Sequence, residues 1–302
     1  MKQAAHGTQT EPAHFTYGSV ERRRANLTTA ELEQYLQSST PVILEGALEA
    51  CPALQRWSSP EQLAERVGNI PVPLTRLPSG PIRYYRDLPH VTTPFAECVR
   101  LIFGRDGRSY YVHQADLIEQ SPQLREDLVF PYPELALSFQ QALFWIGSGD
   151  TVSRLHCDFP HNFIGQFKGK KRFRIFPQAQ APHFYPPPPY APDPYHTPVS
   201  TMGDTSLSDY PRFANARGFE CVVGEGDMLV LPSLWWHQVI AEEPSVMVNW
   251  FGLSAAMVRD WPRLRDWAAA LYMERWEHAI ERLRMFVENE TRECTRVEAT
   301  ES

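Results

Sequence analysis

The segment His156-Cys157-Asp158 and the later segment Pro232-Ser233-Leu234-Trp235-Trp236-His237 decide how this chain is interpreted. Residues two positions apart in a strand point to the same side, so His156 and Asp158 can share one inward face. His237 lies shortly after an apolar run, residues 228–231, and can supply a third ligand from elsewhere in the chain. Two imidazoles and one carboxylate form a facial triad, which holds one side of an octahedral Fe(II) and leaves the other side open. The two segments therefore predict a metal site.

The sequence around these segments, between residues 109 and 251, is mostly of β type. Short apolar stretches alternate with turns that contain glycine. Two of these turns, Lys168-Gly169-Lys170 and Gly224-Glu225-Gly226-Asp227, are interpreted as β-hairpin turns. The expected strands are residues 110–114, 142–146, 162–167, 172–176, 219–223, 228–231 and 246–251. Short strands joined by such turns indicate a sandwich or a barrel.

Upstream of residue 109 the pattern mixes helices and strands. Thr28 and Glu31 form a capping box that predicts a helix through residue 36. A second helix is expected from Pro60 to Gly68, with proline at its first position, and a third from residue 93 to Gly104. Strands are expected at residues 41–44, 72–77 and 82–86. The basic run at residues 22–24 is interpreted as a solvated helix entry.

The composition is that of an ordinary globular protein: 302 residues, 43% of them hydrophobic and 22% charged. The net charge of -7 argues against a nucleic-acid partner, which usually needs a basic face. We find no apolar stretch that approaches the length of a membrane span and no signal-peptide core, so we expect a cytoplasmic protein without a membrane partner. The five cysteines form no CxxC motif and are interpreted as reduced thiols.

After Gly252 the pattern becomes helical, with apolar residues repeating at three- and four-residue steps. The repeat comprises Leu264, Trp267, Leu271, Trp276, Ile280, Leu283 and Val287. This stripe either packs on the chain's own barrel or forms a self-association face. We carry forward the prediction of a homodimer through these C-terminal helices.

Longer motifs surround the predicted ligands. His156, Asp158, Asn162 and Lys171 fit the pattern His-x-Asp-x-x-x-Asn with a later lysine, and residues 219–237 fit its second half. On these motifs, residues 40–255 resemble the JmjC-type, cupin-like Fe(II)/2-oxoglutarate dioxygenases, most closely the asparaginyl hydroxylase that inhibits the hypoxia-inducible factor. The resemblance implies a mainly β fold with flanking helices and a double-stranded β-helix (jelly-roll) core. The expected division is a disordered N-terminus (1–17), the dioxygenase domain (18–255), a helical region (256–288) and a disordered tail (289–302).

The same resemblance implies Fe(II), 2-oxoglutarate and O2 as cofactors, with the iron on His156, Asp158 and His237. In that family a lysine pairs with the distal carboxylate of 2-oxoglutarate, helped by a tyrosine and a serine or threonine. Lys171, Tyr111 and Ser153 fall in register with these residues. Asn162 and Asn249 match the two asparagines that line the family's site.

The residues alone leave alternatives open at these positions. Lys171 follows two residues from Gly169 and is solvated in the simplest interpretation, like Lys168 and Lys170. Tyr110 and Tyr111 point to opposite faces of a strand, so only one of them can enter the barrel. Ser153 either binds the cosubstrate or caps the turn after residues 149–150.

One departure from the resembling family concerns the substrate, and another concerns the second cupin motif. Where the asparaginyl hydroxylase grips its target amide with an arginine and a glutamine, our register places Val199 and Ser200, and Phe251 stands in place of a tryptophan. Leu234 replaces the usual glycine of the second cupin motif. The Pro- and Tyr-rich stretch at residues 182–198 is either a lid or a flexible linker. Together with Phe159, Tyr185, Tyr190 and Phe251, it suggests a pocket for an apolar or aromatic-containing target.

We therefore expect an oxygenase that hydroxylates a C–H bond of a protein or peptide side chain and releases succinate and CO2. If the target carbon bears nitrogen, the same step gives demethylation. A small-molecule hydroxylase is the alternative. A non-enzymatic cupin would not need His156, Asp158, His237 and Lys171 together. A tRNA-modifying relative is disfavoured by the net negative charge of the chain.

Overall fold

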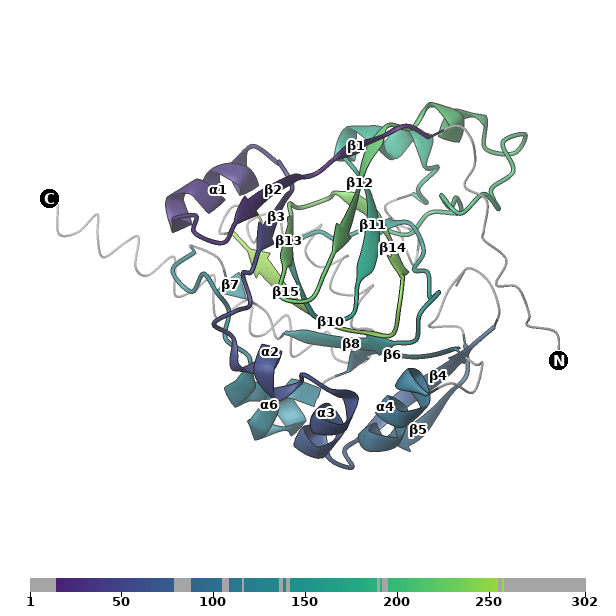
Figure 1. The fold of residues 1–302 in the computed structure, drawn as a ribbon. Coiled ribbons are helices and arrows are strands. Elements are labelled where there is room, and N and C mark those ends of the chain that lie inside the picture. Colours follow the sequence, from purple (N-terminus) through teal and green to yellow (C-terminus); the bar gives the residue numbers. More distant parts are fainter. Residues whose placement is uncertain are drawn as a thin grey trace, which may run out of the picture.

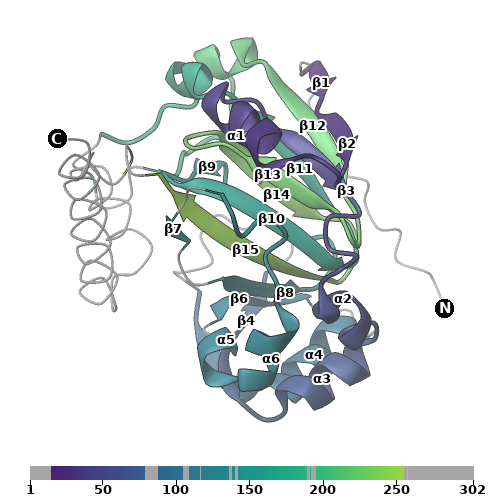
Figure 2. The same cartoon turned by 90° about the vertical axis from the view of Figure 1, so that its left-hand side faces the viewer.

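The computed structural model describes residues 15–78, 88–104, 109–115, 117–135, 138–139, 142–188, 191, 195–254 and 257. Within them two β-sheets face each other, and a group of helices covers one side of the larger sheet (Figures 1 and 2). The architecture is mainly β with flanking helices around a jelly-roll core, as the sequence predicts.

The smaller sheet has five strands in the described residues, and it carries the predicted metal ligands. In spatial order these strands are β1 (Tyr17–Ser19), β12 (Gly218–Val223), β11 (Lys171–Phe176), β14 (Trp236–Ala241) and β9 (His156–Cys157). All neighbours are antiparallel except β1, which runs parallel to β12.

The larger sheet has ten strands in the described residues. In spatial order they are β2 (Glu21–Arg24), β3 (Val42–Glu45), β13 (Met228–Leu231), β10 (His161–Lys168), β15 (Ser245–Leu253), β8 (Leu143–Gly147), β6 (Ser109–Ala115), β4 (Pro71–Leu77) and β5 (His90–Pro94), while β7 (Ser138–Phe139) pairs with the end of β15.

Helices flank both sheets. They are α1 (Thr29–Gln37), α2 (Pro52–Arg56), α3 (Pro60–Val67), α4 (Phe95–Phe103), α5 (Leu117–Gln120) and α6 (Pro122–Asp127), with the 3-10 helices η2 (Gln178–His183) and η3 (Pro211–Asn215). The expected capping box is present, because the Thr28 hydroxyl accepts from the Glu31 N–H and the Glu31 carboxylate accepts from the Thr28 N–H. Ser59 caps α3, whose Gly68 end has a φ of +70°.

The two glycine turns are not hairpins, contrary to our expectation. β10 pairs with β13 and β15 in the larger sheet, whereas β11, which follows the turn at Gly169, pairs with β12 and β14 in the smaller sheet. The turn at residues 224–227 likewise leads from β12 in the smaller sheet to β13 in the larger one. A jelly roll passes the chain from sheet to sheet, so both turns connect the two sheets rather than neighbouring strands.

Residues 22–24 lie in a strand and not at a helix entry. β2 runs parallel to β3, and all of its side chains are exposed. Arg22 donates to Glu45 and to Asp227, which explains how a basic run is accommodated at this edge. Phe15 and Tyr17 pack near Phe213 and Phe176, so the folded part of the chain begins before our expected boundary at residue 17.

Among the described residues, apolar side chains form three large layers, besides a small cluster around Leu77 and Tyr111. One lies between the helices and the larger sheet, with Phe95 and Phe144 in edge contact. A second fills the space between the two sheets, where Ile164 of β10 packs with Phe173 of β11. The third, which we call the outer cluster, covers the far side of the smaller sheet and comprises Leu155, Cys157, Phe176, Phe184, Val199, Phe213, Ala216 and Trp236. The smaller sheet is therefore covered on both faces.

Several expectations fall outside the described residues. They are the strand at 82–86, residues 1–14 of the N-terminal segment, and the C-terminal helices with their dimer stripe and tail beyond residue 257. The four cysteines in the described part of the chain are free thiols. No helix in that part is long and apolar enough to cross a membrane.

Candidate metal centre

The structure brings the three predicted ligands together. β9 pairs with β14 so that His156 lies opposite His237, and Asp158 follows β9 directly. One potential ligand atom from each residue lies within 4.8 Å of the other two. His237 Nε2 is 3.5 Å from Asp158 Oδ2. The donors are two imidazole nitrogens and one carboxylate oxygen, a set that suits Fe(II).

Backbone carbonyls fix the tautomer of both histidines. His156 Nδ1 is 2.7 Å from the carbonyl oxygen of Arg154, and His237 Nδ1 is 3.0 Å from that of Trp235. A carbonyl oxygen can only accept, so each Nδ1 carries the proton and donates it. Each Nε2 therefore keeps its lone pair and can bind a metal.

Asp158 is held by a short chain of buried amides. Asn162 donates from Nδ2 to Asp158 Oδ2 over 3.0 Å. Asn249 donates from Nδ2 to Asn162 Oδ1 over 2.8 Å. All three side chains are buried, so few water molecules compete for these bonds. The two predicted asparagines therefore act on the carboxylate ligand as well as lining the site.

Burial sets the protonation of the site. It is the main cause that holds the pKa of His156 well below its usual range, with nearby His237 adding to the effect. Burial lowers the pKa of His237 to about 4. Both imidazoles are thus neutral near pH 7, as metal binding requires. Burial also raises the pKa of the Cys157 thiol well above its usual range, so this residue between the two ligands offers no thiolate.

A cavity with about 740 Å3 of empty space, which includes the open solvent at its mouth, surrounds the three ligands. Its lining includes Tyr111, Trp145, Ser153, Asn162, Ile164, Lys171, Phe173, Tyr195, His196, Val239, Met247, Asn249 and Phe251. All of the predicted site residues therefore lie at one cavity.

Lys171 marks one end of this cavity and is not solvated. Its side chain is only 2% exposed, although it starts β11 directly after the turn at Gly169. The ring of Tyr111 lies 6.0 Å from the Lys171 amine, and burial lowers the pKa of Lys171 to about 7. Tyr110 packs instead into the layer beneath the helices, so Tyr111 is the tyrosine that enters the barrel.

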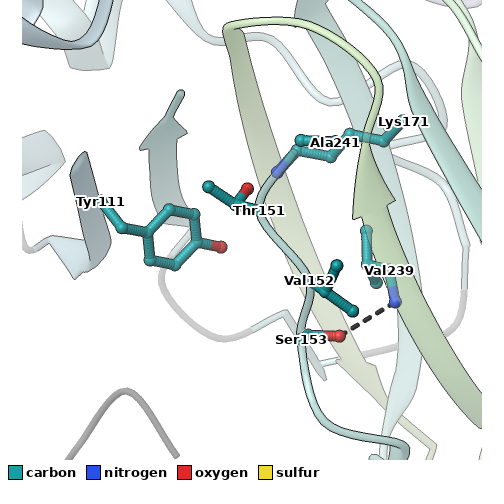
Figure 3. Close-up of a pocket in the computed structure, with 7 residues that line it drawn as sticks. All are labelled: Tyr111, Thr151, Val152, Ser153, Lys171, Val239 and Ala241. Atoms are coloured by element: carbon teal, nitrogen blue, oxygen red, sulfur yellow. Dashed lines mark hydrogen bonds between the residues drawn. The ribbon is translucent and has the colours of Figure 1, made fainter. Parts of the chain in front are cut away.

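Thr151 is a residue of this end that our sequence reasoning missed. Figure 3 shows the side chains of Thr151, Tyr111 and Lys171 directed into the same space. The Ser153 hydroxyl also lines the space, but it donates to the Arg154 carbonyl and accepts from the Val239 N–H. Thr151 lies two positions before Ser153, and that spacing on one face would have identified it.

The residues proposed to face the substrate are distributed differently from our expectation. Val199 is buried in the outer cluster, and the Ser200 hydroxyl accepts from Gln238, so neither lines the cavity. Tyr185 packs against Tyr210, also away from the cavity. Phe251 does line it, whereas Tyr190 lies outside the described residues. Segment 197–201 crosses the far side of the smaller sheet, which a register based on motifs alone does not show.

Trp145, Tyr195 and His196 line the cavity and were not predicted. Trp145 faces inward because β8 pairs it with Met247 of β15. Its buried Nε1 has no hydrogen-bond partner among the described residues. Tyr195 and His196 come from the end of the Pro-rich stretch.

Comparisons with known proteins agree with this geometry. The family model described as "Cupin-like domain" matches residues 28–252. The chain is 29% identical over 234 residues to lysine-specific demethylase 8 of Xenopus tropicalis, covering 72% of this chain and 49% of that protein. It is 26% identical over 244 residues to lysine-specific demethylase JMJ30 of Arabidopsis thaliana, covering 78% of this chain and 55% of that protein.

A tRNA-modifying protein matches this chain over a similar number of residues. The chain is 27% identical over 241 residues to tRNA wybutosine-synthesizing protein 5 of Homo sapiens, covering 72% of this chain and 74% of that protein. The chain spans about half the length of the two demethylases named above. Particular closeness to the asparaginyl hydroxylase stays a prediction.

Proposed function

This chain belongs to the cupin-like domain family, and we propose that it is an Fe(II)/2-oxoglutarate-dependent oxygenase. The observation that carries the proposal is the pairing of two features in one cavity. A cluster of two neutral imidazoles and one carboxylate lies at its centre. A buried lysine without an acidic partner among the described residues lies at its end.

His156, Asp158 and His237 would hold the metal, which leaves positions for a bidentate 2-oxo acid and O2. When bound, Fe(II) with 2-oxoglutarate and O2 supplies the oxidation of an unactivated C–H bond to an alcohol, with succinate and CO2 as coproducts. The protein's part is to bind and orient these groups and to exclude bulk water from them.

Lys171 would pair with the distal carboxylate of 2-oxoglutarate. A buried carboxylate without a charge partner costs several kcal/mol, and a buried amine has the same difficulty, so each group relieves the other. Tyr111 and Thr151 add hydroxyl groups at this end of the cavity, and Ser153 orients the neighbouring backbone. The Asn249–Asn162 pair keeps Asp158 pointed at the metal position.

We propose a protein or peptide side chain as the substrate. Two relatives are named lysine-specific demethylases, which supports a side-chain target and includes the outcome in which the hydroxylated carbon bears nitrogen. Tyr195 and Phe251 line the cavity and suit an apolar or aromatic part of that target. A small metabolite is the alternative, since the lining of the cavity combines apolar side chains with a few polar groups, as small-molecule sites do.

A tRNA nucleoside is a second candidate because the match to the wybutosine-synthesizing protein spans most of that protein. The net charge of -7 opposes it, since RNA binding usually needs a basic face. In the basic strand β2, Arg22 pairs with two carboxylates and Arg23 pairs with Glu21, which neutralises part of the strand's positive charge.

Metal binding is the first test. Wild-type protein should bind one Fe(II), or Co(II) as a stable substitute, and Asp158→Ala should lose most of the metal and all turnover of 2-oxoglutarate. Asp209→Ala, which removes an exposed carboxylate far along the chain, is the matched control and should behave as wild type. Full metal occupancy in Asp158→Ala would refute the assigned ligand set.

A screen for succinate release then identifies the substrate class. Peptide libraries, small-metabolite mixtures and total tRNA are compared at equal 2-oxoglutarate concentration, with mass spectrometry for a gain of one oxygen or a loss of one methylene. Stimulation by peptides supports the proposal, and stimulation by tRNA alone would replace it with the second candidate.

A further inference from the structure

A short segment of the Pro-rich stretch extends the smaller sheet beside the metal ligands. His196 forms an antiparallel bridge with His156 at the free edge of β9. The Cys157 N–H donates to the Tyr195 carbonyl over 3.0 Å, and the Thr197 N–H donates to the Leu155 carbonyl over 3.0 Å. These two bonds flank the His156–His196 pair, so the backbone of His196 has little freedom relative to that of His156.

The imidazole of His196 lies against the imidazole of His156. Their ring centroids are 4.9 Å apart and their planes differ by 7°, which is a stacked arrangement. His196 lines the same cavity as the three ligands. It is nevertheless not a member of the cluster whose ligand atoms lie within 4.8 Å of one another. His196 therefore contacts a ligand without belonging to the ligand set.

The chain after His196 is anchored next to both histidine ligands. Arg154, whose carbonyl accepts from His156 Nδ1, donates from Nη2 to the Thr197 carbonyl over 3.1 Å. Thr201 donates from its N–H to Gln238 Oε1 over 2.8 Å, and Gln238 directly follows His237 in β14. The buried Arg174 of β11 also donates to the Thr201 carbonyl over 2.7 Å. The position of His196 is thus fixed by strands β11 and β14 and by the residues just before β9.

We propose that His196 is a positioning residue for His156: its flat ring, held by segment 195–201, limits rotation of the His156 ring. This inference rests on the proposed metal-dependent function. The Arg154 carbonyl holds one edge of the His156 ring, and the His237 ring lies 4.1 Å away between centroids but is tilted by 49°, so neither contact lies flat against the ring to limit its tilt. A parallel neighbour at stacking distance removes the tilt, so that Nε2 keeps its direction toward the metal position.

The test uses Co(II), whose visible spectrum reports ligand geometry without substrate or turnover. The affinity and spectrum are compared for wild type, His196→Phe, which keeps a flat ring, and His196→Leu, which fills space without one. We expect His196→Phe to bind Co(II) within about threefold of wild type and His196→Leu to bind about tenfold more weakly with an altered spectrum, the range seen for residues that orient metal ligands. Equal affinities and spectra for the Phe and Leu variants would overturn the proposal.

Further measurements distinguish a positioning role of His196 from a purely structural role and from direct binding of the metal. The unfolding temperature of the metal-free variants identifies a purely structural effect, which would lower stability equally for Phe and Leu and leave the metal affinities of the folded proteins unchanged. A third imidazole bound to Co(II) in X-ray absorption would make His196 a ligand and overturn its positioning role. His90→Phe removes an exposed imidazole on β5 and controls for adventitious Co(II). Failure of wild type to bind Co(II) would refute the proposed function itself.

Discussion

Leu234 donates its backbone N–H to the carbonyl oxygen of Asp158 over 2.8 Å while its own φ is +61°. This left-handed conformation is costly for a residue with a side chain, by about 1–2 kcal/mol. The second cupin motif usually has glycine at this position. Leu234 therefore adopts a backbone conformation that glycine would adopt without strain. The strained turn lies between β13 and β14. Its hydrogen bond to Asp158 joins the start of β14, which carries His237, to the residue that follows β9.

We predict that Leu234→Gly is more stable than Leu234→Ala by roughly 1 kcal/mol, because both remove the side chain and only glycine accepts the left-handed φ freely. The free energy of unfolding from denaturant titration, measured without metal, provides the comparison. The wild-type side chain packs partly against the outer cluster, so wild type itself is not the appropriate reference. An alanine variant as stable as the glycine variant would show that the turn carries no strain.

The amide chain behind Asp158 leads to a second prediction. Asn162→Leu removes the donor to Asp158 Oδ2 while keeping the branching of the side chain, and we expect metal affinity to fall about tenfold. The measurement is a Co(II) or Mn(II) titration. Gln166→Leu, a buried amide on the same strand that does not line the cavity, should leave the affinity unchanged. Equal losses in both variants would point to a general disturbance of β10.

The cosubstrate end of the cavity is tested through Lys171. Lys171→Met should raise the apparent KM for 2-oxoglutarate steeply while metal affinity stays nearly intact, because the amine and the metal ligands occupy different parts of the cavity. Steady-state succinate release gives the apparent KM for 2-oxoglutarate, and Co(II) titration gives the metal affinity. Lys170→Met, one residue earlier and exposed, is the matched control. An unchanged KM in Lys171→Met would remove this residue from cosubstrate binding.

Lys171 also predicts how stability depends on pH. Its pKa is lowered from 10.5 to about 7 by burial, so between these values the unfolded chain binds a proton that the folded protein does not. Stability therefore rises with pH across this window, by roughly 1 kcal/mol per pH unit, and the destabilisation caused by burying Lys171 is greatest below pH 7. Lys171→Met lacks the proton and should lack this slope.

The pH dependence due to Lys171 is the difference in the free energy of unfolding between wild type and Lys171→Met. Free energies of unfolding are measured at pH 7 and at about pH 8.5 for wild type and for Lys171→Met, without ligands. Cys98, whose pKa burial raises to about 12, has the opposite pH dependence but is common to both proteins and cancels. Parallel pH profiles would mean that Lys171 is protonated in the folded protein throughout.

The candidate metal ligands could be predicted from the sequence because short-range patterns determine them, whereas Lys171 was assigned by the family resemblance, since its local sequence favours a solvated position. His156 and Asp158 are two positions apart on one face, and His237 follows an apolar strand that has to be buried. The seven strands expected between residues 109 and 251 are all present within two residues of their predicted bounds, whereas β7, β9 and β14 were not expected. The alternation of side chains along a strand showed only that one of Tyr110 and Tyr111 enters the barrel. The family register favoured Tyr111, and the structure packs Tyr110 in the layer beneath the helices.

The sheet that each strand joins, and the residues that loops bring to the site, could not be predicted in this way. A glycine turn has the same local sequence whether it closes a hairpin or crosses between sheets, so the turns at Gly169 and Gly226 were misinterpreted. His196 reaches His156 through a bridge that depends on the folding of a long Pro-rich stretch. Val199 was placed at the site by register alone, whereas its apolar side chain belongs to the outer cluster.

The neighbouring positions of β9 and β14 have a consequence for biosynthesis. A chain synthesised from its N-terminus has strands β8 to β13 before it has β14, so it carries His156 and Asp158 while the third ligand and the partner strand of β9 are still missing. Closing so long a loop is entropically costly until the packing around it is complete. Metal loading at the proposed site would therefore follow the emergence of nearly the whole barrel from the ribosome, and a nascent chain halted before Trp236 would offer only two of the three proposed ligands.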